Sequence, residues 1–191
     1  MAPSESEAYA LVALMEIQAS RLRARTGPDG EIITLDKQDR ARWDRLLITH
    51  GLTALERAEE LGGTGSYAIQ AKIAACHARA PRAEDTDWGR IASLYGGLVA
   101  STRSPIVELN RAVAVSMADG PAAGLAVTDG LLDVAALRSY HLLPSVRSDL
   151  LAKLGRSAEA RAEFERAAEL TSNEAERSHL LARAGTRSRC G

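Results

Sequence analysis

The side chains with the clearest capacity for chemistry lie close together, in the stretch QDRARW at residues 38–43. An arginine such as Arg40 can bind a carboxylate through two parallel hydrogen bonds, and Trp43 offers a flat face for stacking. Together with Gln38 and Asp39, these residues could line a site for a ligand or a peptide. The interpretation that we favour is architectural: Asp39 caps a helix, Trp43 fills the core and the arginines make surface ion pairs.

A second polar site could form from residues on different predicted helices, namely His77, Asp87, Asn110 and His141. The alternative for His77 is a buried, hydrogen-bonded role, because it shares a helical face with Ile69 and Ile73. A related hypothesis is a small-molecule pocket built from Trp43, His77, Trp88 and His141.

Polar residues within two of the predicted helices allow both a structural and a functional interpretation. Asn110, followed by Arg111, is a poor residue for the middle of a helix, so it predicts either a specific hydrogen bond or a grip on a peptide backbone. For Arg147 and for Asp149, two residues further along, we predict an interhelical salt bridge, because a buried charge requires a partner. A contact to another protein is the functional alternative for Arg147.

The sequence lacks the patterns that support catalysis or metal binding. It contains no glycine-rich phosphate loop, no nucleophile elbow and no H-E-x-x-H pair. The four histidines have no metal-site spacing, and Cys76 and Cys190 give neither a zinc pattern nor a disulfide framework. We therefore expect no catalytic residues, no metal, no cofactor and no enzymatic activity.

Composition limits the partners further. The formal net charge is −1, which gives no overall attraction to nucleic acid, so we expect no direct DNA binding. No apolar run approaches the ~20 residues that span a bilayer, and acidic residues precede the first apolar run, unlike a secretory signal. The expected location is the cytoplasm, with no membrane contact.

Apolar spacing with glycine and proline punctuation predicts a succession of helices. The first covers residues 6–25, and its predicted apolar face is Leu11, Leu14, Met15, Gln18 and Leu22. Residues 31–35 form a connector, and Asp36 is the predicted N-cap of a helix that runs to Leu61. The predicted apolar face of this helix is Trp43, Leu47, Leu52 and Leu55. Later helices are expected over 66–80, from Trp88 onward, between Ser104 and Gly120, after Pro121, from Pro144 to Gly155, over 157–170 and over 173–184.

These elements predict an all-α fold. Residues 154–170 resemble the second half of a tetratricopeptide (TPR) repeat, with Gly155, Ala160, Phe164, Ala167 and Leu170 at the expected offsets. We predict stacked antiparallel helix pairs in a TPR-like α-solenoid, forming a single domain over residues 1–191. Within it, 1–35 would be an N-terminal helix and connector, 36–184 the helical stack and 185–191 a frayed tail.

Six blocks in a fixed order give a more specific resemblance, over about residues 8–184. They are LDKQDRARWDR, IAACHARAP, DTDWGRIASLY, SPIVELNRAVAV, GPAAGL and YHLLPSVRSDLLAKLGR. Their order and spacing are similar to the C-terminal TPR-like extension of one group of bacterial extracytoplasmic-function (ECF) sigma factors. The family's DNA- and polymerase-binding regions would lie before residue 1, so we expect an excised or truncated C-terminal domain.

The resemblance implies a regulatory or protein-interaction domain that modulates transcription initiation. Its implied partners are the sigma core regions, RNA polymerase and a possible dedicated protein. A homodimer of the excised domain is also expected, through the face that the rest of the protein would cover. The alternative function is a free-standing TPR-like scaffold or small-ligand sensor.

Overall fold

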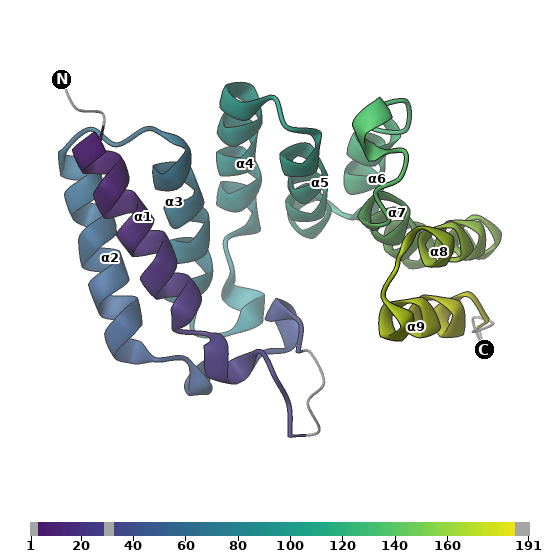
Figure 1. Ribbon diagram of the computed structural model, residues 1–191, viewed down its shortest axis with the longest axis horizontal. Coiled ribbons are helices and arrows are strands. Elements are labelled where there is room, and N and C mark those ends of the chain that lie inside the picture. Colours follow the sequence, from purple (N-terminus) through teal and green to yellow (C-terminus); the bar gives the residue numbers. More distant parts are fainter. Residues whose placement is uncertain (1–3, 29–32, 186–191) are drawn as a thin grey trace. The chain divides into compact units, whose positions relative to one another are not determined.

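The structure, a computed structural model, describes residues 4–28 and 33–185, and the secondary structure in these ranges is helical without β-strands (Figure 1). The predicted all-α class is therefore confirmed. The chain divides into two compact units, Met1–Thr102 and Arg103–Gly191, and each is described by itself. The prediction of a single domain stays a prediction. The expected connector lies partly, and the expected tail almost wholly, outside the described residues.

The described residues of unit 1 form four α-helices and four short 3₁₀ helices. The α-helices are α1 (Ser4–Ala19), α2 (Arg45–Glu60), α3 (Ser66–Arg79) and α4 (Trp88–Thr102). The 3₁₀ helices are η1 (Leu22–Ala24), η2 (Leu35–Lys37), η3 (Arg40–Arg42) and η4 (Ala83–Asp85). Helix α1 packs against α2 and α3, and α3 packs against α4.

The predicted start of the second long helix at Asp36 is wrong. Gln38 and Trp43 have extended backbones, so residues 35–42 form two separate 3₁₀ turns. Helix α2 begins only after Asp44, whose carboxylate accepts hydrogen bonds from the backbone N–H groups of Leu46 and Leu47 at 3.0 and 3.2 Å. Because each of the acidic residues 36, 39 and 44 could cap a helix, local sequence could not select among them.

The predicted apolar face of α1 is also wrong. The fully buried residues are Ala10, Ala13 and Ile17, whereas Met15 and Leu22 are 62% and 61% exposed. Small side chains allow α2 to approach closely at Gly51. A Cβ atom on Gly51 would lie 2.7 Å from Ile17 Cγ1, which leaves no room for a side chain. Close packing of backbones, rather than hydrophobicity, selects the buried face.

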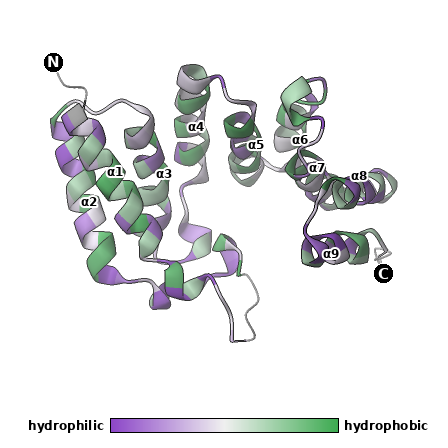
Figure 2. Ribbon diagram, viewed as in Figure 1, coloured by the Kyte–Doolittle hydropathy of each residue, from purple (hydrophilic) through white to green (hydrophobic). Residues whose placement is uncertain are grey.

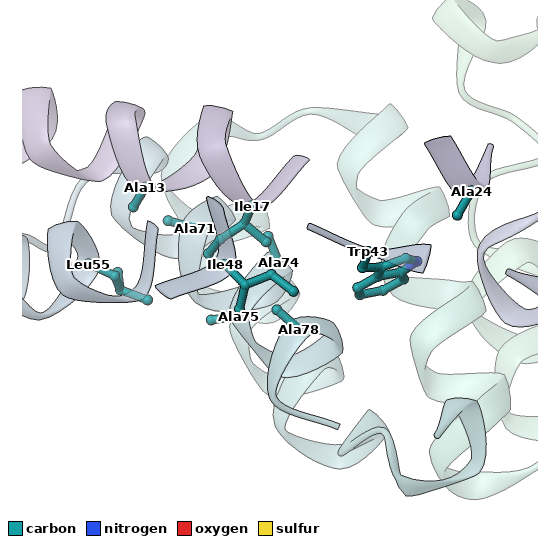
Figure 3. Close-up of a cluster of buried hydrophobic side chains, with 10 residues drawn as sticks. All are labelled: Ala13, Ile17, Ala24, Trp43, Ile48, Leu55, Ala71, Ala74, Ala75 and Ala78. Atoms are coloured by element: carbon teal, nitrogen blue, oxygen red, sulfur yellow. The ribbon is translucent and has the colours of Figure 1, made fainter. Parts of the chain in front are cut away.

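The core of unit 1 combines a few large residues with many alanines. Figure 3 shows Trp43, from the segment before α2, in one cluster with Ile17, Ile48 and Leu55. The remaining members of the cluster are Ala13, Ala24, Ala71, Ala74, Ala75 and Ala78. Trp43 and Leu55 are buried as predicted, while Leu47 and Leu52 are only half-buried.

Over residues 103–185, unit 2 forms five α-helices and one 3₁₀ helix. They are α5 (Pro105–Asp119), α6 (Pro121–Asp129), η5 (Ala135–Leu137), α7 (Leu142–Lys153), α8 (Ser157–Leu170) and α9 (Glu174–Gly185). The predicted stops are confirmed at Gly120 and Gly155, whose φ angles of 95° and 73° favour glycine. Helix α8 packs against α7 and α9, with Ala160, Phe164 and Ala167 buried.

Candidate functional site

The QDRARW stretch is organised around the buried guanidinium of Arg40. Asp39 caps the short η3 turn by accepting a hydrogen bond from the Ala41 N–H at 2.9 Å. That turn directs the Arg40 side chain inward, where only 8% of the residue is exposed. Its Nη1 donates to the backbone oxygens of His77 and Ala80 at 2.8 and 2.6 Å.

The second terminal nitrogen of Arg40 makes a third buried hydrogen bond. Arg40 Nη2 donates to Thr86 Oγ1 at 2.9 Å. The guanidinium therefore donates to carbonyls at the end of α3 that have no partner within the helix. It also links this end of α3 to Thr86, the residue that follows η4. The expectation that both arginines make surface ion pairs is wrong for Arg40. Arg42 is exposed, and it donates to the Arg23 carbonyl.

Trp43 is a core residue with two cations against its ring. It is 3% exposed, and the guanidinium carbons of Arg40 and Arg21 lie 5.1 and 5.8 Å from the ring centroid. These distances fit cation–π contacts. Its Nε1 has no hydrogen-bond partner among the described residues. Trp43 therefore stabilises unit 1 and does not present an open stacking surface.

His77 is buried, as the structural interpretation predicted. Its ring meets the Trp88 ring edge-on, with 5.2 Å between centroids. Burial, followed by the nearby charges of Arg21 and Arg40, lowers the pKa of His77 to about 4. The imidazole is neutral near pH 7, and its Nδ1 has no hydrogen-bond partner among the described residues.

Gln38 and Asp87 also serve local structure. Gln38 is 9% exposed and donates from Nε2 to the Ile33 carbonyl at 3.0 Å. Asp87 is exposed and accepts a hydrogen bond from the Arg90 N–H at 2.9 Å, so it caps α4.

A surface pocket of about 270 Å³ lies beside the Arg40 contacts. It is lined by Cys76, Arg79, Ala80, Pro81, Asp85, Asp87 and Arg90. Among the predicted site residues only Asp87 lines it. The remaining residues that line the pocket were not predicted from the sequence, because the pocket forms only where the end of α3 meets the start of α4. The charged residues on both sides of Pro81 were the one sequence signal that pointed to a polar surface in this segment. Burial raises the pKa of the Cys76 thiol, which disfavours a reactive thiolate. The lining carries both signs of charge, and both carboxylate oxygens of Asp85 accept hydrogen bonds from Arg82.

Arg147 is the corresponding buried arginine of unit 2. It is 8% exposed, and its Nη1 donates to Thr128 Oγ1 and Asp129 Oδ1 at 3.0 and 2.6 Å. Its Nε donates to Glu163 Oε1 at 3.0 Å. The predicted interhelical salt bridge is confirmed, because these partners belong to α6 and α8. Asp149 is likewise paired across helices, with Arg183.

The other predicted residues of unit 2 comprise one exposed residue, one member of an ion pair within α5 and one histidine that contacts α9. Asn110 is exposed on α5, and Arg111 donates to Glu108 one turn earlier at 2.7 and 2.8 Å. His141 Nε2 lies 3.3 Å from Glu176 Oε1. His77 and Asp87 belong to unit 1, whereas Asn110 and His141 belong to unit 2. The proposed four-residue pocket therefore stays a prediction. Of the four residues predicted to build a small-molecule pocket, His77 and Trp88 are in ring contact within unit 1.

Within residues 4–28 and 33–185, no three His, Cys, Asp or Glu side chains are grouped so that they could hold a metal ion. In the same ranges, no helix combines the length and apolar character that crossing a membrane requires.

Comparison with known proteins gives two matches. Residues 1–59 match a family described as "Family of unknown function (DUF6596)". An uncharacterized protein of Rhizobium meliloti (strain 1021) is 44% identical over 178 residues, which cover 93% of this chain and 42% of that protein. The chain thus spans less than half the length of this relative. No solved structure matches the chain.

Proposed function

We propose that this chain is a cytoplasmic, TPR-like regulatory domain of an ECF sigma factor, acting through protein contacts rather than catalysis. The observation that carries the proposal is the set of six ordered sequence blocks that resemble the C-terminal extension of such factors. The length of the Rhizobium relative fits a domain within a larger protein, since the chain covers only 42% of it. In this role the domain would contact neither DNA nor a membrane directly.

The helical units support a role in binding. Two blocks contain Arg40 and Arg147, and each arginine joins separate helical segments of its unit through buried hydrogen bonds. These contacts make each unit a firm scaffold. The exposed pocket between α3 and α4 then offers a preformed surface of mixed polarity, in which Arg79 and Arg90 lie beside Asp85 and Asp87. A peptide segment with both charges fits this lining.

The regulatory mechanism follows from differential binding. The domain would hold the promoter-binding regions of the factor in a competent or an inhibited arrangement. A partner shifts the balance between these arrangements only if it binds one of them more tightly. The partners are the sigma core regions, RNA polymerase or a dedicated protein.

Binding to separately purified sigma core and RNA polymerase tests the proposal. An Arg79→Glu, Arg90→Glu double variant reverses two charges of the pocket, while Arg57→Glu reverses an exposed charge on α2 outside it. We expect the wild type and Arg57→Glu to bind the sigma core or polymerase and the double variant to lose binding, with all three equally helical. Wild-type protein that binds neither, or a domain deletion that leaves promoter output unchanged at equal protein level, overturns the proposal.

A small-ligand sensor is the second candidate, and the same pocket favours it. A volume of about 270 Å³ suits a compact molecule with opposite charges, such as an amino acid. Titration calorimetry with a panel of free amino acids tests this function. Saturable heat that disappears in the Arg79→Glu, Arg90→Glu variant supports it, and absence of heat with the whole panel rejects it.

A further inference from the structure

Helix α1 carries apolar residues on two opposite faces. Figure 2 shows hydrophobic residues along most of its length, after a hydrophilic start. The inner face of α1 consists of Ala10, Ala13 and Ile17, and beyond the end of α1 it is continued by Ser20 and, in η1, by Ala24; each of these residues is no more than 2% exposed. The outer seam consists of Ala8, Val12, Met15, Ala19 and, in η1, Leu22. Both sets follow a spacing of three and four residues, which places each set on one side of a helix.

The two faces differ in their neighbours. The inner face meets α2 and α3. In the outer seam Val12, Met15 and Leu22 are 45%, 62% and 61% exposed. A helix that is apolar all round is normally buried on all sides, and a heptad-like seam is the pattern that packs against another helix. The outer seam therefore has the chemistry of a helix–helix interface.

The sequence of the outer seam is complementary to itself in the antiparallel direction. With Met15 opposite Met15 on a two-fold axis, Val12 faces Ala19 and Ala8 faces Leu22. Each larger side chain off the axis thus meets an alanine, which is how facing helices interdigitate. From Ala8 to Ala19 the part of the seam within α1 spans about 16 Å at the helical rise of ~1.5 Å per residue, and Leu22 follows in η1.

The charges at the ends of the seam favour the same arrangement. Glu5 is exposed before the seam, and Arg23 is exposed just after it, followed by the half-buried Arg25. In the antiparallel register Glu5 of one chain lies within one turn of Arg23 and Arg25 of the other. A parallel pair would instead place like charges together, which is unfavourable.

We propose that the outer seam of α1 is a homodimer interface, in which two copies of this chain pair through antiparallel α1 helices around Met15. Such an isologous contact is closed by its two-fold symmetry. The inference deepens the expected self-association by naming its residues and direction, and it does not depend on the sigma-factor proposal.

Sedimentation velocity of the full chain over a wide concentration range tests the interface. Met15→Glu places two carboxylates opposite each other on the axis, so we expect it to be monomeric where the wild type is dimeric. Leu46→Glu is the matched control, because Leu46 on α2 is 64% exposed against 62% for Met15 and lies outside the seam. Helical circular dichroism confirms that both variants are folded. Either of two results overturns the proposal. The first is a monomeric wild type, which would mean that the outer seam packs against a helix of another protein. The second is equal dissociation of the Met15→Glu and Leu46→Glu variants.

Charge reversal tests the direction. Glu5→Arg and Arg23→Glu should each weaken the dimer by removing an attraction, and the double variant should recover it by restoring opposite charges. Failure of the double variant to recover, with both single variants weakened, rejects the antiparallel register. A monomeric Met15→Glu protein that still binds the sigma core shows that dimerisation and the proposed function are separate.

Discussion

Replacing Arg40 with alanine should destabilise unit 1 by about 3 kcal/mol. The variant leaves the His77 and Ala80 carbonyls and the Thr86 hydroxyl without the donors that now lie at 2.8, 2.6 and 2.9 Å. A buried polar group left unpaired costs about 1–3 kcal/mol, so three groups set an upper limit near ~9 kcal/mol. Water entering the vacated space offsets part of this cost, and the lower end of the range is the appropriate expectation.

Tryptophan fluorescence gives a readout confined to unit 1. The chain contains two tryptophans, Trp43 and Trp88, and both belong to this unit. Urea unfolding followed by fluorescence therefore measures the free energy of unfolding where Arg40 acts. Circular dichroism on the same samples reports the helices of both units.

Arg42→Ala is the matched control, two residues away in the same 3₁₀ turn. Arg42 is exposed and donates one hydrogen bond to the Arg23 carbonyl, so its loss should change the free energy of unfolding by no more than about 0.5 kcal/mol. Arg40→Lys should fall between the two, because an ammonium group cannot reproduce the fork of the guanidinium. Equal unfolding midpoints for Arg40→Ala and Arg42→Ala would refute the assigned role of Arg40.

Three further predictions use the same unfolding measurements. Gly51→Ala should destabilise unit 1 by about 1–3 kcal/mol through overpacking. Gly96→Ala should stabilise the unit by about 0.5–1 kcal/mol, because among the described residues no atom outside its own helix backbone lies within 4 Å of the new Cβ. Fluorescence midpoints that move in the same direction for both variants would contradict this. Because the pKa of His77 is about 4 in the folded protein against 6.5 ordinarily, the unfolded chain takes up the proton first. Unit 1 should therefore lose up to about 3 kcal/mol as the pH falls from 6.5 to 4, and His77→Phe should lose less over that window; an unchanged pH profile in the variant would reject the assignment. Arg147→Ala should destabilise unit 2 by about 3 kcal/mol, measured by urea unfolding followed by circular dichroism. Arg156→Ala removes one member of an exposed ion pair and should leave the unfolding curve unchanged. Equal unfolding curves for the two variants would contradict the buried role of Arg147.

Local sequence was sufficient for most helix boundaries in unit 2. Pro105 begins α5 and Gly120 ends it, and Gly155 separates α7 from α8. These signals act within a few residues, through the fixed φ of proline and the left-handed φ that glycine permits. For the same reason residues 157–170 were predicted as one helix and form α8 without change.

Local sequence could not assign the roles of the QDRARW residues. It offered Asp36 and Asp39 as caps and treated Arg40 and Arg42 alike, since all four are polar residues in one short segment. The partners of Arg40 lie 37, 40 and 46 residues further along the chain, so only the tertiary contacts separate it from Arg42.

The two faces of α1 show the same division. The sequence by itself determined that α1 is a helix and that apolar residues recur along it. Which face is buried was decided by tertiary structure, because Gly51 of α2 lets Ala13 and Ile17 approach more closely than the bulkier face with Met15 could. Helix type and ends depend on backbone preferences within a few residues, whereas burial depends on the shapes of surfaces that only the folded chain brings together.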